Sequence, residues 1–214
     1  MVTHLTYKKY RPLYATIYLV IFLILATLVK LKSPLITNFD TTIQKLLLPI
    51  TTPDMTALVD KITFLGGPEM SFIYCLLLCL IVYLLHDTSD ALWALSTVVF
   101  CNLINWIVKN IVARTRPSDR LVEINGYSFP SGHTFGTALF VLLVFFLFLP
   151  HIQTKGLKTL LHIVGILWII IIALTRIYLH VHYPTDTIAS IFLVGFLFEC
   201  SLIITEAYQH QKKA

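Results

Sequence analysis

Long apolar runs separated by short polar connections dominate the chain. Six of these runs are candidate membrane spans, at residues 13–30, 69–86, 91–112, 134–149, 159–175 and 187–205. An α-helix needs about 20 mostly apolar residues to cross the hydrocarbon core of a bilayer. The pattern therefore predicts an integral membrane protein. The connection at 86–90 is so short that the second and third spans are expected to form an antiparallel hairpin.

Residues 33–65 mix apolar and polar positions at roughly helical spacing. One helical face would carry the apolar residues Ile43, Leu46, Leu47 and Ile50, and away from it would lie the polar residues Asp40, Thr41 and Lys45. Such a segment lies on the membrane surface rather than across it. We therefore predict an all-α fold, a six-transmembrane-helix bundle with an additional interfacial amphipathic segment. It forms a single domain over residues 1–214.

The composition agrees with a membrane protein. Hydrophobic residues make up 57% of the chain and charged residues only 13%, whereas soluble proteins carry about a quarter charged residues. The net charge of +5 does not indicate a nucleic-acid partner, because the basic residues are scattered at the ends of the spans. All four cysteines lie inside apolar runs, so neither a disulfide framework nor a zinc site is predicted. The first apolar run is too long for a signal peptide and lacks a cleavage site, so we interpret it as a retained span.

The basic residues also bear on topology. Six spans place both termini on one side of the membrane, with 7 Lys and Arg residues on that side against 9 on the other. A role in binding an anion is more specific for Lys109, Arg116 and Arg176 than a role in topology. Without these three residues, the count of Lys and Arg becomes 7 against 6. The positive-inside rule then predicts a multi-pass protein of the cell (plasma) membrane, with cytoplasmic termini and the polar loops on the outer face.

Two polar connections on that outer face, 108–133 and 175–186, hold residues unlike the rest of the chain. Lys109 and Arg116 are seven residues apart, which places them on one helical face, about 10 Å apart along the axis. Pro117 disfavours helix at Arg116, so the helix is expected to end there. The two cations can converge on an anion. Alternatively, they extend to the lipid headgroups, as cations at span ends often do.

The second feature is Ser131-Gly132-His133, at the start of the fourth span. Ser131 is a favourable N-cap residue, and the free N–H groups of a helix start attract phosphate. Gly132 allows close approach of a ligand to the backbone. The alternative is ordinary helix capping, with no function for His133.

The third feature combines Arg176, His182 and Asp186. Pro184 suits the first turn of the last span, which leaves His182 just outside the helix and Asp186 within that turn. A carboxylate there can reach back, as in a capping box, and hold the Nδ1–H of the imidazole so that Nε2 is free as a nucleophile. The alternative is that Asp186 only caps the helix. His180 competes for the nucleophile role but has no carboxylate at the same offset.

These three clusters share one membrane face. Phosphoryl transfer needs cations around the phosphate oxygens, an in-line nucleophile and a proton donor for the leaving group. The clusters supply all three.

The clusters also resemble the three signature motifs of the type 2 phosphatidic acid phosphatase superfamily. In chain order these motifs are Lys109 with Arg116-Pro117, then Pro130-Ser131-Gly132-His133, then Thr175-Arg176 with His182 and Asp186. Order and spacing match throughout, and the one departure is Thr175, where the family often has serine. The vanadium haloperoxidases share these motifs but are soluble, and the six spans argue against them.

The resemblance implies that His182 attacks phosphorus and forms a phosphohistidine, that Asp186 orients His182, and that His133 is the general acid for the leaving oxygen. It implies that the phosphate oxygens are held by Lys109, Arg116, Ser131, Gly132 and Arg176. It also implies that the enzyme needs no metal or cofactor, and that its substrate is a lipid phosphate among the membrane lipids. Undecaprenyl pyrophosphate and phosphatidylglycerophosphate are favoured, with phosphatidate open. Candidates for headgroup selection are Arg114, Arg120 and Glu123. The sequence does not determine the oligomeric state.

Two other classes of function compete with this interpretation. The first is a transporter or flippase that binds anionic lipid at the same cations without chemistry. Charged groups within the spans would favour transport, and we interpret the span centres as uncharged. The second is a structural membrane protein with degenerate motifs, which predicts the loss of at least one motif residue. No such residue is lost.

Overall fold

The computed structural model describes residues 9–85 and 88–213, with the side chains of Lys212 and Lys213 excepted. Within these ranges the fold is helical without strands, which confirms the all-α prediction. The helices are α1 (Arg11–Lys30), α2 (Pro34–Leu47), α3 (Pro53–Leu65), α4 (Pro68–Leu85), α5 (Thr88–Val112), α6 (Gly132–Leu147), α7 (Lys155–Tyr178) and α8 (Pro184–Lys213). Two short 3₁₀ helices, η2 (Leu48–Ile50) and η3 (Leu149–His151), lie between them.

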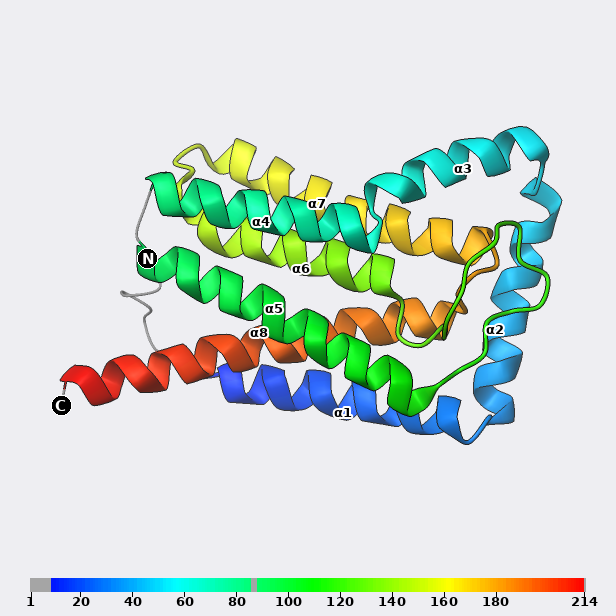
Figure 1. The fold of residues 1–214 in the computed structure, drawn as a ribbon, viewed down its shortest axis with the longest axis horizontal. Helices are drawn as coiled ribbons and strands as arrows, with labels where there is room; N and C mark the ends of the chain where they lie inside the picture. Colours follow the sequence, from blue (N-terminus) through cyan, green and yellow to red (C-terminus); the bar gives the residue numbers. More distant parts are fainter. Residues whose placement is uncertain (1–8, 86–87, 214) are drawn as a thin grey trace.

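Six helical segments are long and apolar enough to cross a membrane, as predicted, and α3 and α4 together make one of them. In Figure 1 the long helices run side by side. The structural bounds differ slightly from the predicted spans. The fourth span was expected to end at residue 149; α6 ends at Leu147, and the 3₁₀ turn η3, which contains Pro150, continues the candidate span to His151. Residue 86 of the second predicted span lies outside the described residues.

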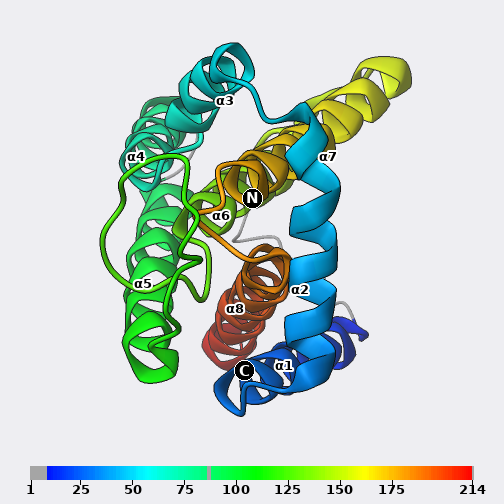
Figure 2. The same ribbon diagram turned by 90° about the vertical axis from the view of Figure 1, so that its right-hand side faces the viewer.

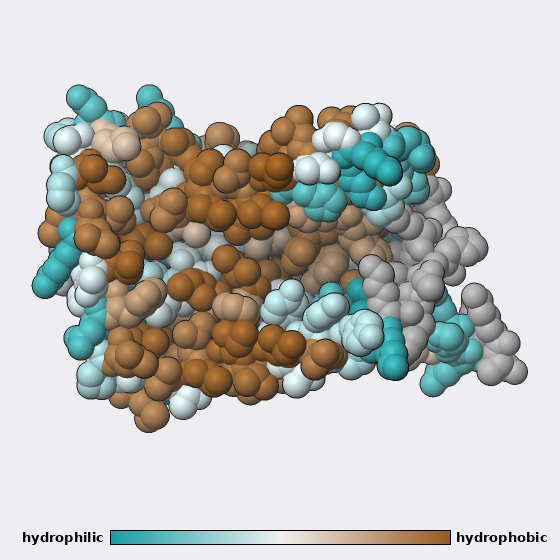
Figure 3. All heavy atoms as spheres, turned by 180° about the vertical axis from the view of Figure 1, so that it is seen from behind, coloured by the Kyte–Doolittle hydropathy of each residue, from teal (hydrophilic) through white to brown (hydrophobic). Residues whose placement is uncertain are grey.

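The centre of the bundle is α6, the most buried of the six candidate spans. It packs against α4, α7 and α8, while α1 packs along α8. Close packing depends on a glycine: a Cβ atom at Gly136 would lie 2.9 Å from the Cβ of Ser71 in α4. Small residues allow this approach, which is how helices associate where lipid removes the hydrophobic driving force. On the face seen in Figure 3, apolar side chains cover the middle of the surface, and hydrophilic side chains gather towards its ends.

Segment 33–65 forms α2, η2 and α3, and Figure 2 shows α2 lying across one end of the bundle. The sequence did not predict which face of α2 meets the bundle. Its buried face is formed by Ile36, Asp40 and Gln44, while Leu46 is exposed. Asp40 is fully buried, because polar partners on other elements meet it there. On the predicted apolar face, Leu46 and Ile50 are exposed, whereas Ile43 and Leu47 are half-buried.

The opposite end of the bundle carries the start of α1 and the end of α8 (Figure 1). There Arg11 donates a hydrogen bond of 2.7 Å to Glu206 and one of 3.0 Å to Glu199. Glu199 falls near the middle of α8 in the sequence, so it qualifies the interpretation that the span centres are uncharged. Its partner belongs to the first turn of α1. Glu199 consequently lies level with the end of the first span, and the ion pair compensates its charge.

Candidate active site

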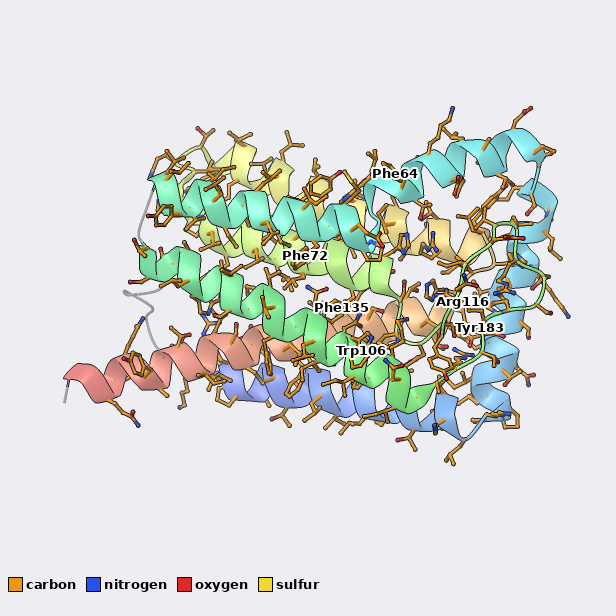
Figure 4. The ribbon with its side chains drawn as sticks, in the orientation of Figure 1. Phe64, Phe72, Trp106, Arg116, Phe135 and Tyr183 are labelled. Atoms are coloured by element: carbon orange, nitrogen blue, oxygen red, sulfur yellow. The ribbon has the colours of Figure 1, made fainter. Side chains whose placement is uncertain are left out.

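Three parts of the chain meet at the end of the bundle that α2 crosses (Figures 1 and 2). They are the loop at 113–131, the start of α6 and the turn between α7 and α8. The loop begins where α5 stops, at Ala113, whose φ of +52° cannot continue a helix. Leu121 N–H bonds to Leu179 O (3.1 Å), which ties the loop to the α7–α8 turn. Figure 4 shows Arg116 of the loop and Tyr183 of the turn at this end.

His182 and Asp186 lie together, as their spacing predicted. Pro184 begins α8 and Asp186 occupies its first turn. Oδ2 of Asp186 accepts the N–H of Tyr183 (2.9 Å), the reach-back of a capping box. The same oxygen lies 3.5 Å from Nδ1 of His182, which is longer than an ordinary hydrogen bond. Asp186 therefore caps its helix and also faces the histidine.

His182 is almost completely buried. Burial lowers the pKa of His182 to about 3, since it disfavours the imidazolium. Asp186 acts in the opposite direction, and the charges of Arg116 and Arg176 act with burial. The imidazole is consequently neutral at physiological pH, which is the protonation state that a nucleophilic histidine needs.

Nε2 of His182 is not free, in contrast to the sequence expectation. Nη1 of Arg116 lies 3.1 Å from it. A guanidinium group has only donors, so Nε2 must be the acceptor and the ring proton must be on Nδ1, facing Asp186. This tautomer directs a lone pair of Nε2 towards the cations.

The placement of Arg116 also differs from the prediction. The helix containing Lys109 ends at Val112, so Arg116 is not on a shared helical face with Lys109. Arg116 is instead held by carbonyl groups: Nε donates to Gly126 O (3.0 Å), Nη1 to Val181 O (2.8 Å) and Nη2 to Asn125 O (3.2 Å). The backbone of two loops, rather than helical periodicity, positions this cation.

Two further cations lie at this end of the bundle, Lys109 in α5 and Arg176 in α7. Nζ of Lys109 donates to Pro130 O (2.6 Å) and Tyr127 O (3.1 Å), just before α6. Nη1 of Arg176 donates to Oγ1 of Thr63 (2.8 Å), while its Nε is buried without a hydrogen-bond partner. A buried guanidinium N–H without a partner is unusual. It is available to an anion.

The start of α6 lies in the same cluster. Ser131 is the N-cap of α6, as predicted, and its hydroxyl accepts the N–H of Thr134 (3.4 Å). Gly132 follows with its Cα against Pro68, since a Cβ there would lie 3.4 Å from that ring. The imidazole of His133 lies beside Gly67, and close enough to His182 for their charges to interact. The charges of Lys109, Arg116 and Arg176 also act on His133.

His180 has a carboxylate partner that its sequence offset did not reveal. Its Nδ1 lies 2.6 Å from Oδ2 of Asp119, in the loop. A carboxylate alone therefore does not distinguish the two histidines. The difference is the surroundings: Arg116 and Arg176 both act on His182. His182 is consequently the better candidate for meeting a phosphate.

One cation outside the signature motifs belongs to the site. Nη1 of Arg114 donates to Oδ1 of Asp186 at 2.7 Å. Nothing in the sequence pairs these residues, because they are 72 positions apart. Sequence reasoning left Arg114 as a candidate for headgroup selection.

The PAP2 superfamily model matches residues 90–210, which include all three motif clusters. The chain belongs to the PAP2 superfamily. Among PAP2 relatives, phosphatidylglycerophosphatase B of Bacillus subtilis (strain 168) is 27% identical over 179 residues, covering 82% of this chain and 86% of that protein. The predicted resemblance is thereby confirmed.

Two solved structures share the PAP2 fold with this chain. One is the crystal structure of a transmembrane PAP2 type phosphatidylglycerolphosphate phosphatase from Bacillus subtilis, with a TM-score of 0.78 and 24% identity, covering 92% of this chain and 96% of that one. The other is Aquifex aeolicus LpxE, with a TM-score of 0.56 and 19% identity, covering 79% and 95%. At these identities the likeness shows the fold.

Proposed function

We propose that this PAP2 protein is a metal-independent membrane lipid phosphatase that acts through a phosphohistidine on His182. It is a phosphoric monoester hydrolase by family and by its similarity to phosphatidylglycerophosphatase B. One observation carries the mechanism: neutral, buried His182 is placed between a carboxylate at Nδ1 and a guanidinium at Nε2.

In the first step Nε2 of His182 attacks phosphorus, and the bond from phosphorus to the lipid oxygen breaks. His133 donates a proton to that oxygen, so the lipid leaves as an alcohol. The imidazole becomes positively charged, and Asp186 stabilises it across the 3.5 Å gap. Catalytic hydrogen bonds are often long in the free enzyme and shorten during the reaction.

In the second step His133, now neutral, accepts a proton from water as the water oxygen attacks phosphorus. The bond between nitrogen and phosphorus breaks, inorganic phosphate leaves, and His182 returns to its neutral form. The charge on the equatorial oxygens during both steps is stabilised by Lys109, Arg116 and Arg176 and, at the start of α6, by the hydroxyl of Ser131 and the N–H of Gly132.

Arg116 has to exchange one partner when phosphate binds. Its Nη1 bonds to Nε2 of His182 in the free enzyme, and a phosphate oxygen takes the place of that nitrogen. The bonds from Arg116 to Gly126 O and Asn125 O hold the guanidinium during this exchange. Nε2 is thereby released at the moment its target arrives.

The proposed substrate is phosphatidylglycerophosphate, with undecaprenyl pyrophosphate and phosphatidate as further members of the panel. The similarity to phosphatidylglycerophosphatase B supports the first choice. The site lies at the opposite end of the bundle from the start of α1 and the end of α8 (Figure 1). Together with the basic residues near both termini, this arrangement supports cytoplasmic termini and a site on the outer face of the cell membrane.

The test uses purified protein in detergent with these three lipids, in EDTA, beside His182→Ala. We expect phosphate release that persists in EDTA and disappears in the variant. His162→Ala is the matched control, because His162 lies in α7 and bonds to Lys158 O. Full activity of His182→Ala would falsify the mechanism. Complete loss of activity in EDTA would contradict metal independence. Binding of the lipids without any phosphate release would favour the flippase alternative.

A further inference from the structure

A buried ionic network lies behind Asp186, on the side away from the histidine. It joins α2, the 113–131 loop and the start of α8 through Asp40, Arg114 and Thr185. None of the three belongs to a signature motif. Asp40 and Asp186 are fully buried, and Arg114 lies between them with a largely buried side chain.

Arg114 holds one carboxylate with each of its terminal nitrogens. Nη1 donates to Oδ1 of Asp186 (2.7 Å), and Nη2 donates to Oδ2 of Asp40 (2.6 Å). The guanidinium also stacks over the ring of Tyr183, 3.8 Å from its centroid. The planar fork and the stacking leave this group little freedom. The position of Asp40 thus determines the position of the nitrogen that contacts Asp186.

Asp40 makes a second connection to the start of α8. Its Oδ1 accepts the N–H of Thr185 (2.9 Å), and its Oδ2 accepts the hydroxyl of Thr185 (2.8 Å). Thr185 is the neighbour of Asp186 in the first turn of α8. A single carboxylate from α2 therefore fixes both the helix turn that carries Asp186 and the cation that binds it. This explains why Asp40 faces the protein rather than water.

The network fixes both oxygens of Asp186. Oδ1 accepts from Arg114 and Oδ2 accepts from Tyr183 N–H. Since a carboxylate is planar, two fixed oxygens leave Oδ2 directed at Nδ1 of His182. A rotated carboxylate would lose this direction.

The charges of the network matter as well. Arg114 alone would neutralise Asp186 and weaken its attraction for an imidazolium on His182. The second negative charge, on Asp40, leaves the group of three with a net negative charge. Burial lowers the pKa of Arg114, but the charges of Asp186 and Asp40 outweigh it and raise the pKa. Burial raises the pKa of Asp40, against the hydrogen bonds from Arg114 and Thr185. Three accepted hydrogen bonds are what make such a buried charge tolerable.

We propose that Asp40 is a positioning residue, which acts on His182 through Arg114 and Asp186. This inference rests on the proposed function of His182 and Asp186. It assigns Arg114 to the orientation of Asp186 rather than to the selection of headgroups. Neither Asp40 nor Arg114 is required to touch substrate.

The first test compares Asp40→Asn with wild type, using radiolabelled phosphatidylglycerophosphate in detergent. The amide retains an oxygen for Thr185 N–H but loses the charge. We expect kcat to fall about 10- to 100-fold, as for outer-shell partners that orient metal ligands, with KM unchanged within about twofold. Asp90→Asn is the matched control, because Asp90 is also a buried carboxylate but lies in the first turn of α5, at the opposite end. Its kcat is expected to equal that of wild type.

A double-mutant cycle separates positioning from general structural damage. If Asp40 acts through Asp186, Asp40→Asn will slow wild type but will not further slow Asp186→Asn. Arg114→Lys should behave in the same way, because lysine keeps the charge but cannot bind two carboxylates as a fork. It provides the test if Asp40→Asn does not fold. The proposal is overturned if the losses of kcat from Asp40→Asn and Asp186→Asn multiply in the double variant, or if Asp40→Asn changes only KM.

The outcomes also separate this inference from the proposed function. Inactivity of the wild type on every lipid phosphate overturns the proposed function, and the inference with it. Activity of the wild type with an unchanged kcat in Asp40→Asn overturns the inference alone.

Discussion

Nη1 of Arg116 lies 3.1 Å from Nε2 of His182, so the atom expected to attack phosphorus is hydrogen-bonded to the cation expected to bind phosphate. This contact determines the tautomer of the histidine and aligns the two groups before substrate arrives. It also makes the free enzyme sensitive to changes at either residue.

Arg116→Lys is expected to lower kcat about 10²- to 10³-fold, the cost of losing one preorganised donor to a developing oxyanion. Lysine cannot reproduce the carbonyl contacts that fix the guanidinium. Steady-state kinetics measure this effect. Arg11→Lys is the matched control, because Arg11 is also a buried arginine but is bonded to Glu199 and Glu206 at the opposite end of the bundle. An Arg116→Lys enzyme within tenfold of wild type would contradict the assigned role.

His133→Ala should slow the first step by removing the proton for the leaving oxygen. Acid–base assistance is worth about 10²- to 10⁴-fold. In the first step, measured as single-turnover release of the alcohol, the loss should be much smaller with p-nitrophenyl phosphate, whose leaving group needs no proton. Comparing the two substrates checks the assignment, and an equal loss on both, or a loss below about tenfold on the lipid, would rule it out.

Acidification should destabilise the fold through His182. Burial lowers its pKa to about 3 in the folded state, against about 6.5 in the unfolded chain. Between these values the unfolded state binds more protons, so stability falls as pH decreases from about 6.5 towards 3. Thermal unfolding of wild type and His182→Gln between pH 7 and pH 4.5 measures this. The variant should lose less stability on acidification than wild type, and identical pH dependence would show that His182 does not titrate this way.

Gly136→Ala should destabilise the contact between α4 and α6. The added Cβ would lie 2.9 Å from the Cβ of Ser71, and overpacking of this kind costs about 1–3 kcal/mol. Gly156→Ala is the control, since nothing lies within 4 Å of a Cβ there. Adding Ser71→Gly to Gly136→Ala should restore much of the unfolding temperature. Failure of that rescue would place the damage elsewhere.

Much of the fold was predictable because it depends on local composition. The six spans and the N-cap at Ser131 follow from residues close together in the chain. The relation between His182 and Asp186 was predictable for the same reason, since four residues at a helix start are enough to specify it. The predicted helical face for Lys109 and Arg116 was wrong, because Ala113 ends the helix before Arg116.

By itself the sequence determined the membrane class, the number of spans, and which residues we propose for phosphoryl transfer. Only the tertiary structure decided how those residues are held. Arg116 is positioned by the carbonyls of two loops, His180 pairs with Asp119, and Asp40 reaches Asp186 through Arg114. The physical reason is that the decisive contacts join groups 61 to 74 positions apart in the chain: Arg116 with Val181, His180 with Asp119, and Arg114 with Asp40 and Asp186. Periodicity and spacing report only on neighbours along the chain, whereas a buried charge is stabilised by whichever partners the packed helices bring to it.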